Sequence, residues 1–95
     1  MTQSKIVILS GSLPNDISDD IYFQLINSAH QKKVNTILDA SGYPFEKGLE
    51  AKPKLAKPDL RASGNRVFNK AIDSQEAAIR IAHEIVSRGS QIAVV

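Results

Sequence analysis

The sequence predicts an α/β fold, with a mostly parallel four-stranded sheet, flanking helices and a partial Rossmann-like core. Along the chain, short apolar runs typical of strands alternate with amphipathic helical patterns, which indicates a parallel sheet built from strand–helix–strand units. The first run, residues 6–9, is apolar at every position, a pattern typical of a parallel strand covered on both faces. The length allows one domain, and the final apolar run, residues 92–95, ends with the sequence instead of leading into a loop, so residues 1–95 are expected to form a single partial α/β domain.

The first predicted strand, residues 5–10, is followed by an amphipathic helix. Ser18 fits the N-cap because its hydroxyl can accept a hydrogen bond from an amide of the first turn, and Asp19 and Asp20 add negative charge there. The apolar residues at helical spacing are Ile21, Leu25, Ile26 and Ala29. Lys32 carries the opposite charge and marks the end of this helix.

The middle of the chain predicts two more strands with a short helix between them. Residues 34–39 form the second strand, and the helix after it places Phe45 and Leu49 one turn apart on the same face. Residues 54–59 form a third strand, which ends near Pro58 because proline has no amide hydrogen to donate to a neighbouring strand.

The last third of the chain predicts a long helix and a final strand. Residues 60–72 show no clear periodicity. Asp73 and Glu76 resemble a capping box, and Gly89 is typical of a helix stop. The apolar stripe of this helix consists of Ala78, Ile81, Ala82 and Ile85. Residues 91–95 then form the fourth strand.

The composition argues against several function classes. Lys and Arg total 12 against 10 Asp and Glu, a net charge of +2, and the cations are scattered rather than interleaved with the aromatic residues, so no nucleic-acid partner is expected. No apolar run reaches the roughly 20 residues that span a bilayer, so no membrane partner is expected. The absence of cysteine suits a reducing compartment, and the expected location is cytoplasmic.

Four segments, in this order and spacing, resemble the central portion of a ribokinase-like (PfkB-type) carbohydrate kinase. The branch with the strongest resemblance is that of the 1-phosphofructokinases and tagatose-6-phosphate kinases. The segments are ILSGSLPNDISDDIYFQLI, ILDASG, GLEAKPKLAKPDL and EAAIRIAHEIVSRGSQIAVV. The resemblance spans nearly the whole chain, and it implies the fold of such kinases and a reaction that transfers phosphate from ATP to a ketohexose phosphate, of the fructose-1-phosphate or tagatose-6-phosphate type.

The resemblance also implies roles for individual residues. Gly11 and Ser12 are expected to bind the sugar phosphate, since glycine lets the backbone approach a ligand and a serine hydroxyl can donate to a phosphate oxygen. Lys57 and Asp59 are expected to bind the nucleotide, with Asp59 as a magnesium ligand. ATP and Mg are thus the cofactors of the complete family enzyme, and no residue of this chain is expected to be catalytic.

The chain departs from the family pattern in two ways. Asp59 stands where the family has asparagine in an Asn-x-x-Glu motif, and Ala62 stands where it has glutamate. The family's N-terminal lid region and its C-terminal Gly-Ala-Gly-Asp segment, with the catalytic base, have no counterpart in these 95 residues. We therefore expect a truncated sugar-phosphate kinase that is inactive in isolation, with self-association through a sheet edge as a homodimer. The alternative is a non-catalytic α/β module that binds a ligand or a protein.

Overall fold

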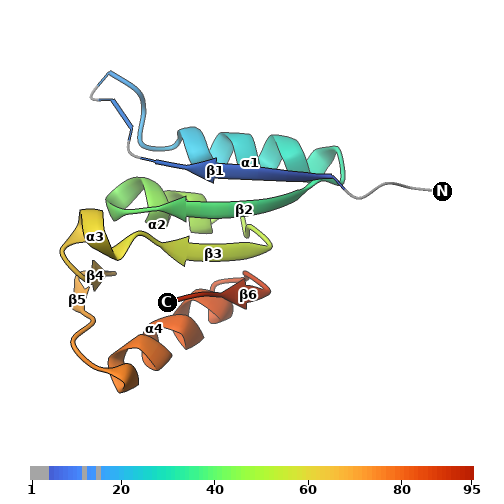
Figure 1. The fold of residues 1–95 in the computed structure, drawn as a ribbon. Helices are drawn as coiled ribbons and strands as arrows, with labels where there is room; N and C mark the ends of the chain where they lie inside the picture. Colours follow the sequence, from blue (N-terminus) through green and yellow to red (C-terminus); the bar gives the residue numbers. More distant parts are fainter. Residues whose placement is uncertain (1–4, 12, 15) are drawn as a thin grey trace.

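The computed structural model describes residues 5–11, 13–14 and 16–95, and shows a parallel sheet with helices packed on it (Figure 1). The sheet has the strand order β1-β2-β3-β6, and all three pairings are parallel. Its strands are β1 (Ile6–Ser10), β2 (Asn35–Ala40), β3 (Leu55–Pro58) and β6 (Ile92–Ala93). The helices are α1 (Ile21–Gln31), α2 (Gly42–Leu49), α3 (Leu60–Ser63) and α4 (Gln75–Ser87). The predicted four-stranded α/β fold is therefore confirmed.

The strand order places the long helices on one face of the sheet. Each strand pairs with the preceding strand of the same sheet, and parallel crossovers are right-handed in about 98% of cases, so successive connections lie on the same side. Burial agrees with this, because one apolar cluster joins the sheet to α1, α2 and α4. Its members include Tyr22, Ile26, Leu38, Phe45, Leu49, Ala56, Ile81 and Ile85.

The opposite face of the sheet is open, which corrects the expectation that the first strand is covered on both faces. Within the described residues no helix packs there, and Ile6 and Ile8 of β1 are 60% and 64% exposed. Only Leu9 of β1 packs against the core, because its side chain points to the helical face. The apolar character of β1 correctly predicted a strand, but it did not predict how many faces are covered.

Helix α1 begins later than its sequence suggests. Its N-cap is Asp20 rather than Ser18, and neither Asp19 nor Asp20 lies inside the helix. The Ser18 hydroxyl instead donates a hydrogen bond to the Asp20 carboxylate, which lowers the pKa of Asp20, with a further contribution from the Gln24 amide. The buried side of α1 carries Tyr22 and Ile26, while Leu25, one of the apolar residues at helical spacing, is 44% exposed.

Helix α4 is capped one residue later than predicted. The Ser74 hydroxyl oxygen accepts a hydrogen bond from the Ala77 amide at 3.1 Å, so Ser74 is the N-cap and Asp73 lies outside the helix. Ala77, Ile81 and Ile85 are buried on the side that packs against the core.

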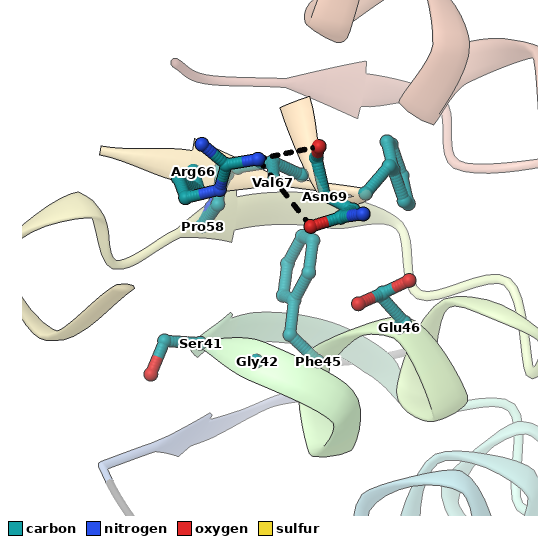
Figure 2. A pocket seen from close by; sticks show the side chains of 9 residues that line it. Ser41, Gly42, Phe45, Glu46, Pro58, Arg66, Val67 and Asn69 are labelled. Atoms are coloured by element: carbon teal, nitrogen blue, oxygen red, sulfur yellow. Dashed lines mark hydrogen bonds between the residues drawn. The ribbon is translucent and has the colours of Figure 1, made fainter. Parts of the chain in front are cut away.

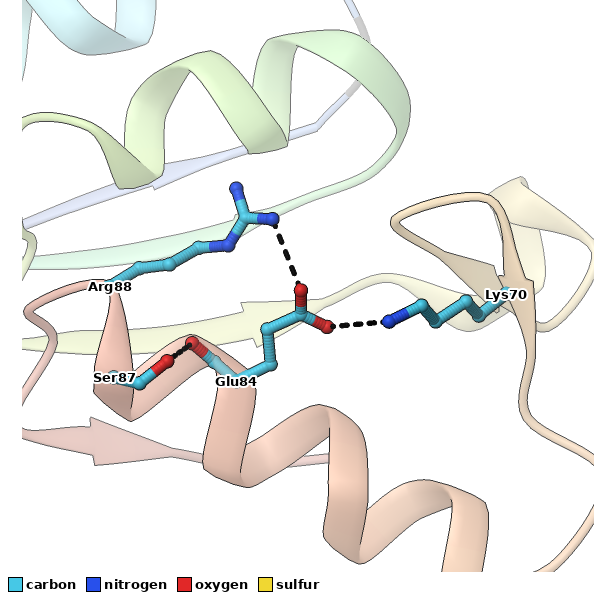
Figure 3. Close-up of polar contacts among 4 residues, drawn as sticks. All are labelled: Lys70, Glu84, Ser87 and Arg88. Carbon is cyan, nitrogen blue, oxygen red and sulfur yellow. Dashed lines mark hydrogen bonds and ion pairs between the residues drawn. The ribbon is translucent and has the colours of Figure 1, made fainter.

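Residues 60–72 contain elements that the sequence did not predict. Helix α3 is followed by a small antiparallel hairpin of β4 (Arg66–Val67) and β5 (Lys70–Ala71). Polar contacts attach this hairpin to α4 (Figure 3). The Glu84 carboxylate accepts from Lys70 Nζ at 3.4 Å and from Arg88 Nη2 at 3.2 Å, and the Arg88 guanidinium lies 3.9 Å from the centre of the Phe68 ring.

In the part of the chain that the structure describes, no helix has the length and apolar character needed to cross a membrane.

Candidate functional site

The residues predicted to bind ligands gather where the parallel strands end. Asp39 pairs in register with Ser10 on one side and with Lys57 on the other, so the carboxyl ends of β1, β2 and β3 form one edge. In open parallel sheets, ligands bind outside this edge. The structure therefore brings the predicted residues Gly11, Lys57 and Asp59 to the same edge; Ser12 lies outside the described residues.

Gly11 directly follows β1 and has a backbone conformation that favours glycine. Its φ is +100°, and a Cβ at this position would meet nothing within 4 Å, so the space beside its backbone is open. Its amide donates to the Asp39 carbonyl oxygen at 3.3 Å, and its carbonyl oxygen accepts from the Tyr22 hydroxyl at 2.7 Å. A cavity of about 280 Å³ opens beside it, lined also by Leu13, Pro14, Ile17, Asp19, Ser41 and Pro44. A small polar ligand can therefore approach the Gly11 backbone.

Tyr22 fixes the turn at Gly11 from the helical side. Tyr22 belongs to α1 and is buried in the apolar core, and its hydroxyl donates the hydrogen bond to the Gly11 carbonyl oxygen. Burial raises the pKa of Tyr22, and the negative charge of Asp39 raises it further, because both disfavour the phenolate. The neutral phenol, which donates the hydrogen bond, is thus the favoured form.

A second cavity at this edge, of about 260 Å³, is lined by charged side chains. Asp39, Lys57, Asp59 and Arg61 all border it, together with Pro58, Leu60, Val94 and Val95. Lys57 is exposed and makes no ion pair within the described part of the chain. Lysine binds phosphate as a point charge, so the arrangement suits a phosphorylated ligand.

Asp59 has a structural role in addition to its place in the charged cavity. Its amide donates to the Ala40 carbonyl oxygen at 2.7 Å, which fixes it beside the end of β2. Its carboxylate caps α3, accepting from the Arg61 amide at 3.2 Å, and lies 3.9 Å from Arg61 Nε. One carboxylate oxygen is therefore already engaged by the protein backbone.

The donor set of the charged cavity fits magnesium in one specific way. Among the described residues there is no cluster of three or more His, Asp or Glu that could enclose a metal ion. Asp39 and Asp59 nevertheless supply two carboxylates to one cavity, and Mg²⁺ in phosphoryl-transfer sites is bound by one or two carboxylates with phosphate oxygens and water. The site therefore fits magnesium that arrives with a nucleotide.

Sequence reasoning missed Asp39, Tyr22 and Arg61. Asp39 could have been found, because the rule that places Gly11 and Lys57 at the carboxyl edge applies equally to the end of the second strand. Tyr22 and Arg61 act through the fold of α1 and α3, and no sequence signal indicates them. Ala62, which stands where the family has glutamate, lies in α3.

A cavity of about 290 Å³ on the helical side contains none of the predicted site residues (Figure 2). It lies between α2, the end of β3 and the β4–β5 hairpin, with the buried Phe45 ring at its floor. Arg66 Nη2 donates to the backbone and side-chain oxygens of Asn69, at 2.8 and 3.3 Å, across its rim. This hollow adjoins the carboxyl edge of the sheet, because it shares Ser41 with the cavity beside Gly11 and Pro58 with the charged cavity.

Comparisons with known proteins confirm the resemblance to the PfkB-type sugar-phosphate kinases. The chain is 32% identical over 95 residues to 1-phosphofructokinase of Bacillus subtilis, which covers all of this chain and 31% of the relative. It is 32% identical over 90 residues to 1-phosphofructokinase of Haemophilus influenzae, and the match covers 95% of this chain and 28% of that relative. It is 31% identical over 87 residues to D-tagatose-1-phosphate kinase of Bacillus licheniformis, and the match covers 92% of this chain and 29% of that relative. The chain thus spans under a third of these relatives.

Solved structures show the same fold. A protein of Thermotoga maritima matches 96% of this chain and 29% of its own, with a TM-score of 0.82 and 24% identity. The tetrameric inhibited form of phosphofructokinase-2 from Escherichia coli matches 90% of this chain and 29% of its own, with a TM-score of 0.75 and 27% identity. No protein-family model matches the chain.

Proposed function

We propose that this chain forms the ligand-binding edge of an ATP-dependent kinase that phosphorylates a ketohexose phosphate, of the fructose-1-phosphate or tagatose-6-phosphate type. One observation carries the proposal: two cavities of similar size lie along the carboxyl edge, one beside the open backbone of Gly11 and one lined by Lys57 and two carboxylates. In this reaction the ATP donor and the ketohexose phosphate, whose hydroxyl is the acceptor, both carry phosphate and must be held side by side. The similarity to 1-phosphofructokinases and to a D-tagatose-1-phosphate kinase supports a ketohexose phosphate as the substrate, and both names favour the 1-phosphate over the 6-phosphate.

Each cavity suits one substrate. The cavity beside Gly11 would take the sugar phosphate, because the Gly11 backbone is accessible and Ser41 adds a hydroxyl. The charged cavity would take the nucleotide phosphates, with Lys57 as the cation and with Asp39 and Asp59 holding the magnesium ion. Magnesium would supply charge neutralisation of the phosphates, while this chain's own residues position the two ligands.

The proposal is tested by titrating the 95-residue protein with MgATP or fructose 1-phosphate and following amide chemical shifts. We expect weak binding, on the order of millimolar, because few contacts offset the cost of association. MgATP should perturb residues 56–60, and the sugar phosphate should perturb residues 10–14. Lys57→Ala should weaken MgATP binding at least about fivefold. The matched control is Lys54→Ala, which removes an exposed lysine from the opposite end of β3.

Two outcomes would contradict this assignment. Equal weakening by Lys54→Ala and Lys57→Ala would show that only the overall charge attracts the nucleotide. Shifts confined to α4 or to residues 32–33 would place the ligands away from the carboxyl edge.

A second candidate function is a non-catalytic module that binds the same ligands. The observation that favours it is the combination of Ala62 in α3 with an Asp59 carboxylate engaged in helix capping. In that case ligand binding would persist in any longer polypeptide that contains this segment, while phosphate transfer would not occur. Assaying both properties on the same preparation separates the two functions.

A further inference from the structure

The open face of the sheet carries a straight apolar row. Ile8, Ile37, Leu55 and Ile92 are register partners across β1, β2, β3 and β6, so their side chains lie side by side on one face. Ile8 is 64% exposed and Ile92 is 45% exposed, and no helix of the described residues covers either. Parallel sheets occur almost only with both faces covered, which indicates that this face has a partner.

The next row toward the carboxyl edge carries opposite charges. Asp39 on β2 and Lys57 on β3 are register partners and project from the same face as the apolar row. Their strands lie in the middle of the sheet, and each charge sits beside one half of the apolar row. A partner that offers a cation opposite Asp39 and an anion opposite Lys57 would therefore complement this face.

We propose that the partner is a second copy of this chain, packed face to face about a two-fold axis parallel to the strands and midway between β2 and β3. Such an axis sets β2 against β3 of the second copy and β1 against β6. Asp39 then meets Lys57 of the second copy, and by symmetry the same charge pair forms twice. The two requirements on the partner are thus met by the chain itself.

The same axis also matches the apolar row. Ile8 meets Ile92 of the second copy, and Ile37 meets Leu55 of the second copy, so four apolar pairs form across the interface. Sheets pack face to face about 10 Å apart, a distance that side chains of this size fill. This arrangement differs from pairing through the free edge of β1. It engages Asp39 and Lys57, so dimer formation and nucleotide binding in the charged cavity would compete for the same two side chains.

The size of the face predicts a weak dimer. Four strands spaced about 4.8 Å apart, with three or four residues of about 3.3 Å each, give roughly 190 to 250 Å² of sheet in projection. Standard interfaces bury about 800 Å² of accessible surface per partner, so this one lies at the small end. We therefore expect monomer and dimer to exchange, with half dissociation on the order of 100 µM.

Sedimentation velocity at protein concentrations from about 10 µM to about 1 mM measures association and, with variants, tests which surface forms the dimer. Ile8→Lys places a charge in the apolar row and should weaken association at least about tenfold. Val7→Lys is the matched control, since Val7 is the adjacent exposed residue of β1 but projects to the helical face. It should leave association within about twofold. Pairing through the β1 edge would instead be weakened by both variants.

Disulfide cross-linking tests the axis independently of folding stability, and the sequence contains no cysteine to interfere. Ile8→Cys combined with Ile92→Cys should give covalent dimers under mild oxidation. The two positions lie on opposite edges of the sheet, about 14 Å apart across three strand spacings, too far for a bond within one chain. Val7→Cys combined with Ile92→Cys should give few covalent dimers.

Three results would overturn the proposal. The first is a wild-type protein that stays monomeric at about 1 mM, which would mean that a different partner covers the face. The second is equal loss of association in Ile8→Lys and Val7→Lys. The third is equal cross-linking of the two cysteine pairs, which would exclude the two-fold axis even if Ile8→Lys failed to fold.

Discussion

At the scale of single residues, Tyr22 connects the helical side of the sheet to the candidate site. We expect Tyr22→Phe to destabilise the protein by about 1 kcal/mol at neutral pH, because the buried hydroxyl loses its hydrogen bond to the Gly11 carbonyl oxygen. Urea unfolding at neutral pH measures this difference. Tyr43→Phe is the control, since the exposed Tyr43 side chain should change stability by less than about 0.5 kcal/mol.

The same hydroxyl predicts a pH dependence. The folded state raises the pKa of Tyr22, so its contribution to stability is fully present below the ordinary tyrosine pKa of about 10 and is lost as pH rises through the folded value. The stability advantage of wild type over Tyr22→Phe should therefore shrink above about pH 10. An advantage that stays constant from pH 7 to pH 11 would contradict the raised pKa.

At the scale of secondary-structure elements, the N-terminus of α4 allows a direct comparison of two adjacent residues. Ser74→Ala should destabilise the protein by about 1 kcal/mol, because the Ala77 amide loses its side-chain acceptor. Asp73→Ala should cost less than about 0.5 kcal/mol, since Asp73 lies outside the helix. Thermal unfolding of both variants decides between the caps, and a larger effect at Asp73 would show that the capping box predicted from the sequence is correct.

The elements show why the sequence predicted the long helices and the strands but not their ends. Apolar periodicity reports which residues pack, and it correctly placed Ile26, Phe45 and Ile81 in the core. Helix ends depend on single hydrogen bonds, and Ser18 and Asp73 are chemically as good caps as the residues that the fold uses. The β4–β5 hairpin was not predicted because two-residue strands carry too little pattern.

The sequence likewise predicted part of the candidate site but not all of it. Gly11 and Lys57 follow apolar strands, so the sheet topology alone brings them to one edge. The double role of Asp59 as a helix cap and cavity residue depends on α3, a four-residue helix with no periodicity to detect. The open face was also unpredictable, because a strand of continuous apolar residues has the same sequence pattern whether one or both of its faces are covered.

At the scale of the whole molecule, the 95-residue protein should transfer no phosphate above background from ATP to fructose or tagatose phosphates in the presence of magnesium. It spans 28–31% of the kinases it resembles, and the roles proposed for its site residues are to position ligands, with none supplying a base to the reacting hydroxyl. A coupled assay for ADP measures this. Turnover that survives purification and disappears in Lys57→Ala would show that these residues suffice for catalysis.

The strand order also has a consequence during protein synthesis. Each strand of the sheet pairs with the one made before it, so β1, α1 and β2 can form a complete unit before β3 leaves the ribosome. No position between two of these strands has to be filled by a strand made later. The sheet then grows in one direction only, away from β1. Among these four strands β6 is made last and contributes two residues of pairing, so it is expected to join after the other three and to detach before them when the protein opens.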